Sequence, residues 1–136
     1  MKKNKVFVYG TLKKGFYNYY RLGLRTGAKY LTTGSITGFA MHDLGYYPCI
    51  VKSAEEDEVH GEVFEILHED LLELINWVES SSGYKAVKVE IDKHDCMAFV
   101  YAFPAIGPKI PSGVWDKEDP VITARAKKEE RVWRTK

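Results

Sequence analysis

The stretch VFVYGTLKKG, residues 6–15, joins a short apolar run to a glycine turn that is followed by two lysines. Residues 5–9 are rich in valine and phenylalanine and predict a β-strand that ends at Gly10. Glycine permits a sharp turn and a close approach of a ligand to the backbone. Because successive N–H groups in such a turn can bind an anion, the turn suits a carboxylate. An ordinary strand-ending turn explains the same residues.

Further strands are predicted along the chain on both sides of a central helical segment. Residues 59–66 and 84–91 alternate between apolar and polar side chains, as half-buried strands do. Residues 96–103 form a continuous apolar run, which is typical of a buried strand. Residues 27–43 carry glycines among β-forming residues and predict one or two strands with glycine bends.

Three helices are predicted. The clearest spans residues 68–78, where apolar residues recur at helical spacing: Leu71, Leu74, Ile75 and Val78. Residues 18–25 predict a short helix with Asn18 as its N-cap. Asp119 followed by Pro120 predicts a further helix start, because aspartate caps and proline fits the first helical position.

Many strands around one central helix, without a repeat or a linker, predict an α+β fold whose antiparallel sheet is strongly bent or closed. The length of 136 residues fits one ordinary domain. We divide the chain into a domain, residues 1–119, and a basic C-terminal helix or tail, residues 120–136.

Composition narrows the function classes. The formal net charge of +1 argues against a nucleic-acid partner or an anionic membrane surface. The chain has no apolar run long enough for a signal-peptide core or a membrane span, which predicts a cytoplasmic protein. Two buried, reduced thiols are favoured over a disulfide between Cys49 and Cys96. The four histidines are scattered without ligand spacing, so no metal site is expected.

Glu79 lies at the end of the central helix, in the stretch NWVESSSGY, residues 76–84. It follows Ile75 by four positions and Leu71 by eight, which places it close to the buried stripe. Burial would raise the pKa of its carboxyl from the reference value of about 4.3, and such a group can act as a general base or acid. A frayed helix end with Glu79 in water is equally compatible with the spacing.

Several stretches together resemble the γ-glutamylcyclotransferase-like family, also called AIG2-like. VFVYGTLKKG resembles the family's first strand with its Tyr-Gly-Ser/Thr-Leu turn. The other matching stretches follow in the family's order: GFAMHDLGYYPCIV (38–51), VHGEVFEI (59–66), LLELINWVESSSGYKAVKVEI (71–91), VYAF (100–103) and IPSGVW (110–115). The resemblance covers roughly residues 5–116, nearly the whole predicted domain.

The resemblance implies a small, mixed, mostly antiparallel β-barrel with a few helices. Enzymes of the family cyclise a γ-glutamyl group to 5-oxoproline and release an amine or an amino acid, so a small-molecule γ-glutamyl substrate is expected. Their catalytic acid corresponds to Glu79, and no metal or organic cofactor is required. The binding residues carried over are Tyr9, Gly10, Thr11, Leu12 and Tyr84.

Two features depart from the family pattern. Ala86 stands where the family often has an arginine, and the basic stretch at residues 125–136 has no counterpart. Both departures are also compatible with a non-catalytic protein of the same fold that binds a small molecule or a partner. The aromatic and basic residues between 13 and 21 resemble a nucleic-acid stacking patch, but the balanced charge favours a pocket wall or core packing.

Overall fold

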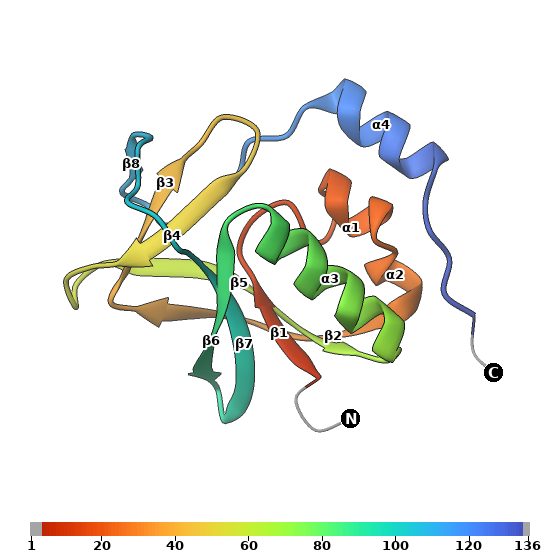
Figure 1. Ribbon diagram of the computed structural model, residues 1–136, viewed down its shortest axis with the longest axis horizontal. Helices are drawn as coiled ribbons and strands as arrows, with labels where there is room; N and C mark the ends of the chain where they lie inside the picture. Colours follow the sequence, from red (N-terminus) through yellow and green to blue (C-terminus); the bar gives the residue numbers. More distant parts are fainter. Residues whose placement is uncertain (1–3, 135–136) are drawn as a thin grey trace.

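The structure is a computed structural model that describes residues 4–134. Within them the chain forms twelve helices and strands, shown in Figure 1. In chain order these are β1 (Lys5–Val8), α1 (Tyr17–Arg21), α2 (Leu24–Gly27), β2 (Ala28–Thr37), β3 (Phe39–Asp43), β4 (Pro48–Lys52), β5 (Glu58–Ile66), α3 (Glu69–Ser81), β6 (Tyr84–Ile91), β7 (His94–Tyr101), β8 (Lys109–Ile110) and α4 (Pro120–Lys128). No helix in this range is long and apolar enough to cross a membrane.

The strands form two sheets. The larger has the order β2-β5-β1-β7-β6, and all its pairs are antiparallel except β1 with β7. The smaller has the order β4-β3-β8 and is antiparallel. β1 is the central strand, and its apolar residues Val6, Phe7 and Val8 are buried. The predicted α+β class with mostly antiparallel sheets is therefore confirmed.

The larger sheet curls until its two edge strands come together. A Cβ atom added at Gly34 of β2 would collide with Cγ2 of Ile91 on β6, so the two edges meet where one has no side chain. The pairings themselves define an open five-stranded sheet and a separate three-stranded one. The closed barrel that the resemblance implies stays a prediction.

α3 crosses one face of the larger sheet, as Figure 1 shows in green. Leu71 and Ile75 are fully buried in the core beneath it, as their helical spacing predicts. The helix runs to Ser81, beyond the predicted end at residue 78. The serines do not break it, because the Ser82 hydroxyl donates to the carbonyl of Val78 at 2.9 Å. Gly83 ends the turn with a φ of 94°.

The predicted helix at residues 18–25 is two short helices, α1 and α2, separated by Gly23 in the left-handed region. The prediction that Asn18 caps this helix is wrong. Phe16 is the N-cap residue, and Asn18 lies inside α1. The Asn18 side chain instead donates to Oγ1 of Thr11 at 2.8 Å and so ties α1 to the turn that follows β1.

The C-terminal segment packs against α1 and α2. Asp119 caps α4 as predicted, because its carboxylate accepts from the N–H groups of Val121 and Ile122. After α4 the chain turns back along α2 (Figure 1), where Trp133 Nε1 donates to the carbonyl of Leu22 at 2.8 Å. Arg25 also forms two hydrogen bonds with the Glu130 carboxylate. The division of the chain into a domain, residues 1–119, and a C-terminal helix or tail, residues 120–136, stays a prediction.

Trp133 fits closely against the helical corner. Its ring stacks on His68 with 5.6 Å between centroids, and a Cβ atom at Gly27 would lie 2.6 Å from its Cδ1. Its backbone N–H donates to the Thr26 hydroxyl.

The two cysteines are not cross-linked. Cys49 and Cys96 are free and buried, which confirms the preference for reduced thiols.

Trp133→Ala is expected to lower the free energy of unfolding by about 2–3 kcal/mol, because it removes a half-buried indole and orphans the Leu22 carbonyl. Urea unfolding at pH 7 measures the change. Val132→Ala is the matched control, since Val132 is 54% exposed and should change stability by less than about 0.5 kcal/mol. Equal free energies of unfolding for the two variants would show that the contacts of Trp133 do not stabilise the fold.

Candidate active site

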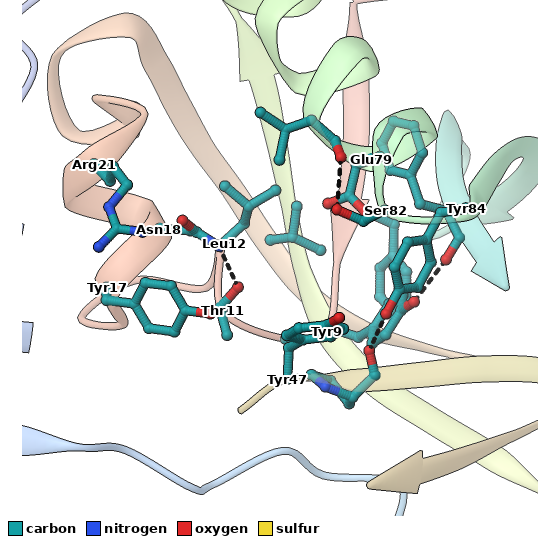
Figure 2. A pocket seen from close by; sticks show the side chains of 16 residues that line it. Tyr9, Thr11, Leu12, Tyr17, Asn18, Arg21, Tyr47, Glu79, Ser82 and Tyr84 are labelled. Carbon is teal, nitrogen blue, oxygen red and sulfur yellow. Dashed lines mark hydrogen bonds between the residues drawn. The ribbon is translucent and has the colours of Figure 1, made fainter. Parts of the chain in front are cut away.

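A cavity of about 230 Å³ opens between the turn after β1, helix α1, the end of α3 and the start of β6. Figure 2 shows its lining side chains. All six site residues predicted from the sequence line it: Tyr9, Gly10, Thr11, Leu12, Glu79 and Tyr84. Residues far apart in the sequence are thus brought to one cavity, and their roles there remain predictions.

The turn at residues 10–12 forms one wall of the cavity. A Cβ atom at Gly10 would lie 2.8 Å from Cγ of Pro48, so glycine is needed for this close packing. The Thr11 carbonyl accepts hydrogen bonds from the N–H groups of Asn18 and Tyr19, at 3.1 and 3.2 Å. These bonds fix the turn against α1.

The same turn offers backbone donors. Within residues 4–134, no hydrogen bond uses the N–H groups of Gly10, Thr11 or Leu12, although all three residues are buried. Buried N–H groups normally have a partner, and unpaired ones carry a desolvation cost. The turn therefore has the donors that a carboxylate or an oxyanion requires.

Glu79 lies in the last turn of α3 and projects toward the cavity (Figure 2). The residue is partly exposed, but burial of its carboxyl raises the pKa to about 7. Desolvation is the cause, and no group in the described part of the chain donates a hydrogen bond to this carboxyl. Near neutral pH, both of its protonation states are populated, as proton transfer in both directions requires.

Two buried tyrosines form the side of the cavity opposite α1. The Tyr9 hydroxyl donates to the carbonyl of Phe99 at 2.6 Å, and the Tyr84 hydroxyl donates to the carbonyl of Pro48 at 2.7 Å. Burial raises the pKa of both phenols above the ordinary value, and the nearby Glu79 raises them further. Both phenols stay neutral near pH 7, and their donors are already used by the protein.

The predicted site residues did not include the cavity residues that α1 and the turn before β4 provide, although the pocket-wall interpretation of residues 13–21 covered part of α1. Tyr17, Asn18 and Arg21 come from α1, and Tyr47 comes from the turn. In the sequence, Arg21 follows Tyr17 by four residues and Asn18 by three, so a helix there would place the three side chains on one face. This spacing could have indicated that they line the same cavity. Tyr19 is buried in the core, in line with the pocket-wall and core interpretation of this stretch.

Ala86 lies outside this cavity. It lines a separate hollow of about 350 Å³, together with Lys5, Cys96 and other residues of β6 and β7. Within the described residues, Ala86 therefore adds no side chain to the cavity that Tyr84, two residues before it on β6, helps to line. Across residues 4–134, His, Cys, Asp and Glu side chains form no group of three or more that could hold a metal ion.

Comparison with known proteins places the chain in a family. Residues 6–117 match the model of the family "Gamma-glutamyl cyclotransferase, AIG2-like". The gamma-glutamylcyclotransferase family protein YtfP of Escherichia coli is 31% identical over 116 residues, which are 85% of this chain and 98% of YtfP. The crystal structure of PH0828 from Pyrococcus horikoshii superposes with a TM-score of 0.69 at 30% identity, covering 81% of this chain and 87% of PH0828.

AIG2-like protein B of Arabidopsis thaliana is 40% identical over 77 residues, which are 54% of this chain and 44% of that protein. The chain thus spans less than half of the plant relative but almost all of YtfP. Because the family model covers most of the sequence, including both the turn after β1 and the end of α3, the chain belongs to the γ-glutamyl cyclotransferase, AIG2-like family.

Proposed function

We propose that the chain is a cyclotransferase that converts a small γ-glutamyl compound to 5-oxoproline and a free amine or amino acid. The observation that carries the proposal is the carboxyl of Glu79, whose pKa is raised to about 7, in a cavity that also contains the buried turn at residues 10–12. Family membership supports the same general function. The enzyme would act in the cytoplasm, as the sequence predicts.

The reaction needs two proton movements at neighbouring atoms. The Glu79 carboxylate takes a proton from the substrate's α-ammonium group, and the neutral amine attacks the substrate's own γ-carbonyl carbon. A C–N bond forms and the carbonyl oxygen becomes an oxyanion. When the intermediate collapses, Glu79 returns its proton to the leaving nitrogen and the old C–N bond breaks. The second proton of the ring nitrogen departs with the released amine, which leaves as an ammonium ion.

The remaining task is to hold the substrate in a folded conformation. Because the attack is intramolecular, the rate depends strongly on how the amine is oriented toward the carbonyl. The N–H groups of Gly10, Thr11 and Leu12 would bind the α-carboxylate or stabilise the oxyanion. The rings of Tyr9 and Tyr84 would enclose the glutamyl carbon chain, since their hydroxyls are bonded to the protein.

Release of 5-oxoproline tests the proposal. The purified chain would be incubated with γ-glutamyl amino acids, γ-glutamyl amines and γ-glutamyl-ε-lysine, and product measured by mass spectrometry. The expected result is 5-oxoproline in equal amount to the released amine for at least one substrate. If the folded protein releases none from any of them, turnover is excluded for these substrates and the non-catalytic alternative gains support.

A further inference from the structure

Two side chains that carry charge line the cavity, and they lie on opposite sides of it. Glu79 comes from the end of α3, and Arg21 comes from α1, across the cavity in Figure 2. Arg21 is exposed, and within residues 4–134 it forms no salt bridge. Its guanidinium lies over the ring of Tyr17, 5.2 Å from the centroid. This contact orients the guanidinium at the cavity wall and leaves its donors available.

Arg21 is displaced from the backbone donors of the turn. Asn18 is bonded to Thr11 and marks the place where α1 touches the turn at residues 10–12. Arg21 follows Asn18 by three residues, about one helical turn, which moves it roughly 5 Å along the helix axis. The cavity therefore has two separate groups that suit anions, one at the turn and one at Arg21.

We propose that Arg21 binds a carboxylate on the leaving group and so selects substrates whose leaving group carries a free carboxylate over those whose leaving group is neutral. This inference rests on the proposed function. If the turn holds the glutamyl α-carboxylate and Glu79 faces the reacting atoms, the leaving group extends toward the remaining wall, where Arg21 lies. A guanidinium pairs with a carboxylate through two parallel hydrogen bonds, whereas a neutral leaving group leaves it hydrated and a cationic one is repelled.

The test compares γ-glutamylalanine with γ-glutamylalaninamide, which differ only in the leaving group's carboxylate. The wild type is expected to prefer the acid by about 3- to 10-fold in kcat/KM, because the guanidinium–carboxylate pair is bidentate but exposed to solvent. Arg21→Met should reduce this preference to about one, and Arg21→Lys should retain an intermediate preference, because lysine keeps the charge without the bidentate geometry. Lys85→Met is the matched control: it removes one exposed positive charge outside the cavity and should keep the wild-type ratio.

Two results would overturn the inference while leaving the proposed function intact. One is a wild type that converts the acid and the amide equally well. The other is an Arg21→Met variant that loses the same factor on both substrates, because Arg21 would then serve the glutamyl end that they share. Absence of 5-oxoproline from both substrates is a different outcome, and it would overturn the proposed function together with this inference.

Discussion

Raising the pH from 4 to 8 is expected to make the Glu79→Gln variant about 3 kcal/mol more stable to unfolding than the wild type. The pKa of the Glu79 carboxyl is about 7 in the folded protein, against an ordinary value of 4.5. A raised carboxyl pKa means that the folded state binds the proton more tightly than the unfolded state. The wild type therefore loses stability as the pH rises from about 4.5 to 7, whereas glutamine has no charge to bury.

Chemical unfolding of both proteins at pH 4 and at pH 8 measures this effect. At pH 4 the carboxyl is protonated in both states, and the difference between the two proteins should be small. Glu73→Gln is the matched control, because Glu73 is exposed on the same helix and its replacement should give the same difference at both pH values. A Glu79→Gln difference that does not change with pH would show that this carboxyl is solvated in the folded protein.

The same substitution is expected to lower kcat/KM for 5-oxoproline release by about 10²- to 10⁴-fold, the usual contribution of a general acid or base. Glutamine keeps the approximate size of glutamate but can neither take up nor return a proton. The gain in stability and the loss of activity would then have one cause, the burial of an ionisable group at a functional site.

Steady-state kinetics of the wild type, Glu79→Gln and Glu73→Gln checks this prediction. Glu73→Gln should stay within about twofold of the wild type, because Glu73 does not line the cavity. A Glu79→Gln variant that keeps more than a tenth of the wild-type kcat/KM would contradict a role for Glu79 in proton transfer.

Much of the fold could be predicted from local patterns. The alternating stretch at residues 84–91 is β6, with the predicted bounds, and residues 59–66 correspond to β5 with one more residue. Alternation works because each strand has one face on the core, where Val59 and Val63 are fully buried. Helix α1 was harder to place, since it has only five residues and its N-cap residue, Phe16, makes no side-chain hydrogen bond.

Strand partners and long-range packing could not be read from local patterns. The parallel pairing of β1 with β7 joins residues about ninety positions apart, and no property of either strand alone specifies it. The contact of Trp133 with Leu22 spans a similar distance along the chain, so the C-terminal stretch was interpreted only as a basic helix or tail. The predicted site residues share the cavity because they lie where an element ends or begins: in the turn after β1, at the end of α3 and at the start of β6.

The first measurement to make is the pH dependence of kcat/KM for 5-oxoproline release, because it depends on both the reaction and the raised pKa of the Glu79 carboxyl. We expect activity to rise with pH along a limb with an apparent pKa of about 7, as Glu79 becomes the carboxylate that accepts the substrate's proton. Any residual activity of Glu79→Gln should lack that limb. A wild-type profile that is flat between about pH 5 and 8, or no 5-oxoproline at any pH, would contradict proton transfer by Glu79 in this reaction.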